Sequence, residues 1–174
     1  MKIKYIFLIL FSCVSLFAQS QEWKRIYGDN TSAVGYYLIE NYDKGYIFIG
    51  SLQDYKYAWI IKTDINGYML WNKKIGNSYT SSMPISITQT RDSGFVLCGS
   101  TTIQDSWYDA YIQKFNACAE PEWCRILNPN TQDPDYGRRI KQLADGGFIL
   151  LTRYLGTEDY DRIHLNKLDE NGNI

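Results

Sequence analysis

The sequence predicts an all-β protein, a β-propeller-like array of four-stranded antiparallel blades. Three observations support this fold class. A tight turn followed by a short apolar strand occurs three times, at 43–51, 92–100 and 145–152. Tryptophan, glycine and lysine residues recur with a period of about fifty residues, which is typical of propellers. Aromatic residues make up 16% of the chain and favour strands over helices.

Three sets of marker residues define the period: Trp23, Trp71 and Trp123; Gly45, Gly94 and Gly147; and Lys62, Lys114 and Lys167. Because three residue types keep one register, chance is a poor explanation. The predicted blades cover approximately 28–75, 76–127 and 128–174, with an extra strand at 22–27. About three blades are fewer than the usual four to eight of a closed ring. We therefore expect an incomplete ring from a longer protein.

Each period is expected to contain four strands. The first strand is expected at 33–41, 84–91 and 137–143. The second follows an Asp-x-Gly turn, in which glycine is expected to supply a positive φ, and its apolar run suits burial on both faces, at 45–51, 94–100 and 147–153. The third strand is expected at 57–64, 109–116 and 163–169. The fourth carries the tryptophan marker, at 69–75 and 122–127.

The connections predict where a ligand would bind. Alternate connections of an up-and-down sheet share an edge, so the short turns should lie on one rim and the long loops on the other. Binding residues are expected on the long loops. The candidates for a glycan or protein ligand are the aromatic and acidic residues Asp54, Tyr55, Tyr57, Asp105, Trp107, Tyr108, Asp159 and Tyr160. The alternative is that these aromatic side chains only pack between blades.

Residues 1–20 have the features of a signal peptide. Lys2 and Lys4 precede an apolar run, and Ala18-Gln19-Ser20 fits a cleavage site. A retained membrane anchor is an alternative, but the run is short for a membrane span. A lipoprotein acylated at Cys13 is a second alternative. The apolar run continues past that cysteine, which argues against it. We expect a secreted or cell-surface protein with no membrane span in the mature chain.

The charge balance and the histidine content argue against several classes of function. The chain has 18 Lys and Arg against 19 Asp and Glu. It therefore lacks the excess of basic residues that is typical of nucleic-acid-binding proteins. His164 is the single histidine and no Gly-x-Ser-x-Gly motif occurs, so we expect no catalytic residue, metal or cofactor. His164 occupies a strand position that suits packing. We interpret 64–67 and 169–172, both Asp-x-Asn-Gly, as hairpin turns and not as calcium loops.

The cysteines predict a structural bond. Cys118 and Cys124 flank a hairpin that contains Pro121, and an exported protein meets an oxidising compartment. We expect a disulfide between Cys118 and Cys124, with two free thiols as the alternative. Cys98 lies in a predicted core strand and is expected to be a buried free thiol.

The repeat carries a resemblance to a known group of proteins. It combines Trp-x-Lys-x-x-Gly at Trp71, Asp-x-Gly-aromatic at Asp43, Asp-Ala-aromatic-Ile-x-Lys at Asp109 and Asp-x-Asn-Gly at Asp64. This pattern resembles the propeller-type repeats of secreted proteins from Bacteroidetes bacteria over 22–174. The resemblance implies an exported array, in a family that often ends in a sorting domain for type IX secretion. The third copy departs from the pattern at Asn128.

These observations favour a non-enzymatic, exported scaffold or binding module. The alternative is a secreted polysaccharide hydrolase, which needs two carboxyl groups about 5 to 9 Å apart. Its catalytic part is either outside this chain or among the loop carboxylates, which are Asp54, Asp105, Asp109, Glu158, Asp159 and Asp161.

Overall fold

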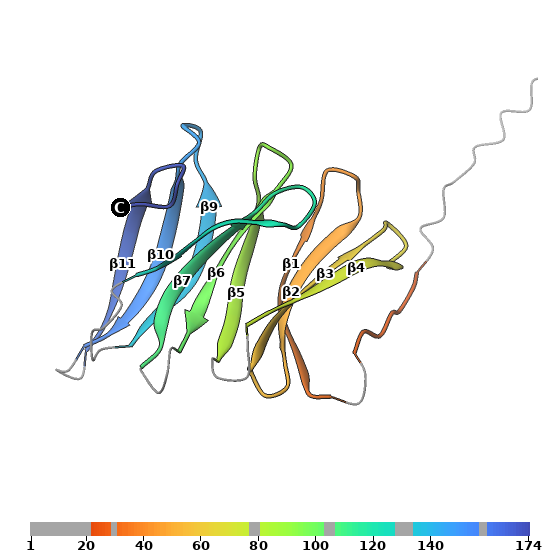
Figure 1. Ribbon diagram of the computed structural model, residues 1–174, viewed down its shortest axis with the longest axis horizontal. Coiled ribbons are helices and arrows are strands. Elements are labelled where there is room, and N and C mark those ends of the chain that lie inside the picture. The colour runs from red at the N-terminus through yellow and green to blue at the C-terminus, as the bar shows by residue number, and fades with distance from the viewer. Residues whose placement is uncertain (1–21, 29–30, 77–80, 103–106, 128–133, 157–159) are drawn as a thin grey trace, which may run out of the picture.

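The computed structural model describes residues 22–28, 31–76, 81–102, 107–127, 134–156 and 160–174. These residues form eleven β-strands and contain no helix, which confirms the all-β prediction (Figure 1). Within these ranges no helix is long and apolar enough to cross a membrane. The predicted leader at 1–20 lies outside the described residues.

The strands form three antiparallel sheets, each ordered as along the chain. Sheet 1 contains β1 (Ala33–Glu40), β2 (Tyr46–Leu52), β3 (Tyr57–Thr63) and β4 (Met69–Ile75). Sheet 2 contains β5 (Ser82–Gln89), β6 (Phe95–Thr101), β7 (Asp109–Phe115) and β8 (Pro121–Ile126). Sheet 3 contains β9 (Asp135–Gln142), β10 (Phe148–Leu155) and β11 (Asp161–Leu168). The three sheets follow one another in a row and do not close on themselves (Figure 1).

Neighbouring sheets pack face to face because β6 is apolar on both sides. Phe95 and Leu97 contact the core shared with sheet 1, which includes Ile49. Val96 and Cys98 point the other way, into the core shared with sheet 3. The first strand of each later sheet makes the closest contacts, β5 with β1 to β3 and β9 with β5 to β7. The middle sheet is therefore covered on both faces, as the sequence predicts for 94–100.

Residues 22–27 do not form the predicted strand. The sequence predicts a strand there, but among the described residues no sheet offers it a neighbour, so it is extended chain without strand pairing. It lies against the outer face of sheet 1. The ring of Trp23 is 6.1 Å from that of Tyr46, and the ring of Tyr27 is 4.9 Å from that of Phe48.

The Asp-x-Gly turns need glycine for a different reason from the predicted one. Positive φ occurs at the middle residue, which is Lys44 (65°), Ser93 (67°) or Gly146 (92°). The glycine that follows is required by close approach. A Cβ on Gly45 would lie 2.1 Å from the carbonyl oxygen of Thr63, which is far inside van der Waals contact. The third strand of the sheet therefore passes directly over the turn.

The lysine markers bind these turns. Lys62 Nζ lies 2.6 Å from Asp43 Oδ1, and the same oxygen accepts the Gly45 N–H at 3.0 Å. The hydrogen bond from Lys62 is the largest cause of the lowered pKa of Asp43. The equivalent pairs are Asp92 with Lys114 at 2.5 Å and Asp145 with Lys167 at 2.9 Å. One ion pair per sheet thus fixes the first turn to the third strand.

Candidate binding site on the long-loop rim

The described turns between the first and second strands lie at one end of the sheets, and the strand ends that lead into the long connections lie at the other (Figure 1). The long-loop end begins with a strained turn in sheet 1. Gln53, Asp54 and Tyr55 have φ values of 53°, 55° and 72°, a conformation that side-chain-bearing residues rarely adopt in succession. This left-handed turn exposes Asp54 and leaves Tyr55 at the surface.

Four tyrosines gather on this rim, one pair near sheet 1 and one pair near sheets 2 and 3. We call them the rim tyrosine cluster: Tyr36, Tyr55, Tyr108 and Tyr136. Tyr36 lies on β1, and its hydroxyl is 3.3 Å from Ser51 Oγ. Burial raises the pKa of Tyr36, a hydrogen bond with Tyr55 raises it further, and Tyr108 is close enough to contribute.

The second pair is a ring contact between two sheets. The rings of Tyr108 and Tyr136 are 5.7 Å apart with an interplanar angle of 30°. The backbone N–H of Asp135 donates to the carbonyl oxygen of Tyr108 at 2.6 Å, which holds the two rings side by side. Burial, followed by the nearby Tyr108 phenol, raises the pKa of Tyr136.

Two guanidinium groups flank this pair. Arg138 Cζ lies 5.6 Å and Arg153 Cζ 6.0 Å from the centre of the Tyr136 ring. Arg153 also pairs with Asp161, with Nη2 2.5 Å from Oδ2. The rim thus combines flat aromatic faces, phenol hydroxyls and hydrogen-bond donors, which together suit a polar ligand with apolar faces.

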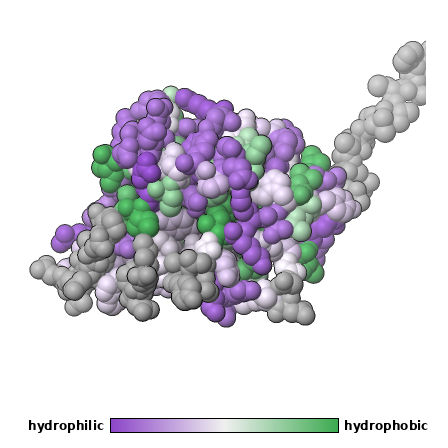
Figure 2. Space-filling model, in the orientation of Figure 1, coloured by the Kyte–Doolittle hydropathy of each residue, from purple (hydrophilic) through white to green (hydrophobic). Residues whose placement is uncertain are grey.

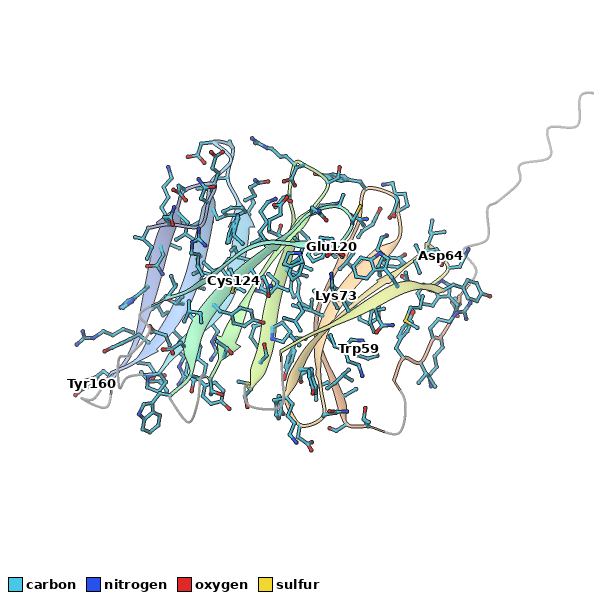
Figure 3. The ribbon with its side chains drawn as sticks, in the orientation of Figure 1. Trp59, Asp64, Lys73, Glu120, Cys124 and Tyr160 are labelled. Atoms are coloured by element: carbon cyan, nitrogen blue, oxygen red, sulfur yellow. The ribbon has the colours of Figure 1, made fainter. Side chains whose placement is uncertain are left out.

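The structure brings together only part of the predicted site. Tyr55 and Tyr108 belong to the rim tyrosine cluster, and Tyr57 is half-buried at the start of β3. Trp107 is exposed beside Tyr108. Tyr160 is exposed next to β11, at the far end of the row from sheet 1 (Figure 3). Asp105 and Asp159 lie outside the described residues.

Sequence reasoning missed Tyr36 and Tyr136, because both lie on first strands and not on the loops. The structure explains the position of Tyr36. The pairing of β1 with β2 shifts between Gly35 and Tyr37, so Tyr36 is the extra residue of a β-bulge, and bulges often redirect a side chain.

The carboxylates proposed for a hydrolase have different environments. Asp54 is exposed, and Asp161 is held by Arg153. Asp109 is buried, its Oδ1 has no hydrogen-bond partner among the described groups, and its pKa is raised by burial and then by Asp135. Asp105, Glu158 and Asp159 lie outside the described residues.

The structure does not confirm the predicted disulfide between Cys118 and Cys124, which it shows as two exposed free thiols. The register of the hairpin gives the reason. Cys124 lies opposite Gln113 on β7, whereas Cys118 lies in the turn and donates its N–H to Asn116 Oδ1. The two residues therefore do not face each other across two strands. Cys98 is a buried free thiol, as predicted.

Alkylation is expected to distinguish the three thiols. Iodoacetamide should modify the exposed Cys118 and Cys124 in the folded protein, with Cys124 slower because burial raises the pKa of its thiol. It should leave Cys98 unmodified, because that thiol is buried, its pKa is raised to about 12, and the thiolate is the reactive form. Peptide mass mapping before and after unfolding in urea measures this. Protection of Cys118 and Cys124 that disappears only after reduction would show instead that they form a disulfide.

The hairpins interpreted as turns in the sequence are turns. Asp64 Oδ1 accepts the N–H groups of Asn66 at 2.9 Å and Tyr68 at 2.8 Å, so the carboxylate closes the backbone. The turn at Asp169 repeats this arrangement. No group of three or more potential metal ligands (His, Cys, Asp or Glu) occurs within the described part of the chain. His164 stacks on Tyr154 at 5.5 Å, which fits a packing role.

No protein-family model matches this chain, and no curated protein matches it either.

Proposed function

We propose that the chain is an exported, non-enzymatic scaffold with a propeller-type arrangement of its sheets. The first strands of all three sheets support this arrangement, because they line one cavity of about 460 Å³. Arg139 of β9 reaches across this cavity, with Cζ 4.2 Å from the centre of the Tyr37 ring on β1. Propeller blades are arranged around a central channel, and first strands that meet at one cavity fit that arrangement.

Carbohydrate is the ligand class that best fits this scaffold, and the rim tyrosine cluster is the observation that carries the proposal. Sugar rings present apolar C–H faces and many hydroxyl groups. Aromatic faces pack against the former, while phenol hydroxyls and guanidinium groups hydrogen-bond the latter. The cluster is also assembled from three sheets, so that a bound chain of sugars would meet contacts from each.

The test measures binding of soluble polysaccharides by affinity electrophoresis, after a glycan array has selected the ligand. Tyr108→Ala and Tyr136→Ala are each expected to weaken binding about two- to tenfold, since an aromatic contact contributes roughly 0.5–1.5 kcal/mol. Tyr108→Phe keeps the ring and should retain most of the affinity. Tyr42→Ala is the matched control, because Tyr42 is exposed on the opposite rim. Equal binding by the Tyr108→Ala and Tyr42→Ala variants would reject this site.

A polysaccharide hydrolase is the second candidate, and Asp109 is the observation that favours it. Burial raises the pKa of Asp109, as required of a general acid, and Asp135 lies near enough to raise it further. Against this role, Asp109 is only 3% exposed. Release of reducing ends from the bound polysaccharide, abolished in Asp109→Asn, would support the hydrolase. Binding without release supports the scaffold.

A further inference from the structure

Both ends of the row of sheets present apolar side chains that are buried at equivalent positions inside the row. At one end, Leu38 of sheet 1 is 63% exposed, whereas its counterpart Ile87 in sheet 2 is 1% exposed. At the other end, Leu165 of β11 is 70% exposed, whereas its counterpart Ile112 is 0% exposed. Hydrophobic residues are visible at both ends of the molecule (Figure 2). Each end face thus resembles one side of the sheet-to-sheet interfaces already present.

The end face of sheet 1 is hollowed into a groove of about 790 Å³. Apolar side chains dominate its lining, including Tyr27, Leu38, Tyr46 and Phe48. On sheets 2 and 3 the same face is covered by the preceding sheet. The shape of the groove therefore suits the first three strands of another sheet of this repeat.

Residues 22–27 already lie where the fourth strand of that sheet would be. A Cβ on Gly67 would lie 2.5 Å from the ring of Trp23, just as a Cβ on Gly172 would lie 2.6 Å from the ring of Trp123. Trp123 belongs to β8, the fourth strand of the sheet before Gly172. Residues 22–27 therefore contact sheet 1 as a fourth strand contacts the following sheet, and differ in having no strand beside them.

Sheet 3 has three strands among the described residues and lacks a fourth beside β11. Its order is β11-β10-β9, so the outer edge of β11 has no neighbouring strand within the described ranges. Charge supports the match. In sheet 2, Lys114 pairs with both Asp92 and Glu122, and its side chain is 8% exposed. Its counterpart Lys167 pairs with Asp145 and remains 66% exposed. By the repeat, the counterpart of Glu122 is Glu22, which precedes Trp23.

We propose that a second copy of this chain covers both ends. Sheet 3 of each copy packs into the groove of the other, and residues 22–27 of each copy pair with β11 of the other. Lys62 lies opposite Trp71 in sheet 1, so the same register places Lys167 opposite Trp23. Two copies of three sheets give six sheets, which is within the four to eight of closed propellers, and a reciprocal contact gives a two-fold dimer.

Light scattering after size exclusion, without any glycan, tests the dimer independently of the binding function. The expected mass is twice that of the chain. Leu165→Lys should shift the protein to the mass of one chain, because a charge would replace an apolar side chain in the interface. Leu70→Lys is the matched control, since Leu70 is exposed on β4 at the position of Glu122 and should leave the dimer intact. A wild-type monomer up to about 1 mM would overturn the proposal.

Cross-linking tests the strand exchange itself. Asn72 lies opposite Ile61, so their counterparts Lys24 and Asn166 should meet across the interface. In a background of Cys118→Ser and Cys124→Ser, a Lys24→Cys chain mixed with an Asn166→Cys chain should oxidise to a mixed covalent dimer. Mixing Lys24→Cys with Arg162→Cys, four residues out of register, should not. Equal yields from both mixtures, or a dimer that forms neither link, would overturn the arrangement.

Discussion

Replacing Phe95 by alanine is expected to lower the free energy of unfolding by about 4 kcal/mol. The ring of Phe95 is fully buried between sheets 1 and 2, where its centre lies 6.3 Å from that of Trp71 and 5.0 Å from that of Phe115. Truncation removes this apolar contact and leaves a cavity. The backbones of two stacked sheets restrict collapse into that cavity, so the cost should lie well above that of a surface change.

Urea unfolding followed by tryptophan fluorescence and circular dichroism measures the effect. Leu70→Ala serves as the control because Leu70 is exposed on β4, and it should change the free energy of unfolding by less than about 1 kcal/mol. Phe95→Leu keeps most of the volume and should cost clearly less than Phe95→Ala. Similar midpoints for Phe95→Ala and Leu70→Ala would contradict the packing described between sheets 1 and 2.

Gly94→Ala is expected to destabilise the protein by about 3 kcal/mol, although the change adds one methyl group. The added Cβ would lie 2.3 Å from the carbonyl oxygen of Phe115, and 3.1 Å from both Asp92 Oδ1 and Thr90 Oγ1. The close neighbour is backbone of β7, so no side-chain rotation relieves the clash. The turn must move away from the strand, which also separates Asp92 from Lys114.

Gly35→Ala is the matched control for this substitution. A Cβ on Gly35 would meet no atom within 4 Å, so thermal unfolding should show a shift of at most a few degrees. Ser93→Gly tests the other half of the turn, since Ser93 carries the positive φ and glycine should relieve strain there. If Gly94→Ala and Gly35→Ala have similar melting temperatures, the close approach of β7 is not the reason that Gly94 is required.

The periodic residues allowed much of the fold to be predicted. Marker tryptophans, glycines and lysines located the strands of all three sheets to within a few residues, because each marker makes a contact inside its own sheet or with the next. The positions of the Asp-x-Gly turns were predicted correctly. The residue with positive φ was not, because it is the middle residue of the turn and not the glycine that follows it. A sequence cannot show that a strand 18 residues later, at Thr63, passes over Gly45.

The site was harder to predict, since it depends on contacts between sheets. Tyr55 and Tyr108 were expected from their loops, but Tyr36 and Tyr136 join them only because first strands converge. The predicted disulfide is not seen for a related reason. A spacing of six residues between Cys118 and Cys124 suggests two facing strands, whereas the turn at Asn116 extends far enough to hold Cys118 away from the ladder.

Face-to-face stacking also determines the order in which parts of the molecule open. Within one chain, sheet 2 contributes to two apolar cores, whereas sheets 1 and 3 contribute to one each. In linear arrays, local stability follows the number of nearest neighbours, so the end units exchange and fray before the centre. In the unassociated chain, amide protons of β6 and β7 are accordingly those that only global unfolding releases. The repeated strand of sheet 2, which is buried on both faces, is thus expected to open more slowly than its copies in sheets 1 and 3.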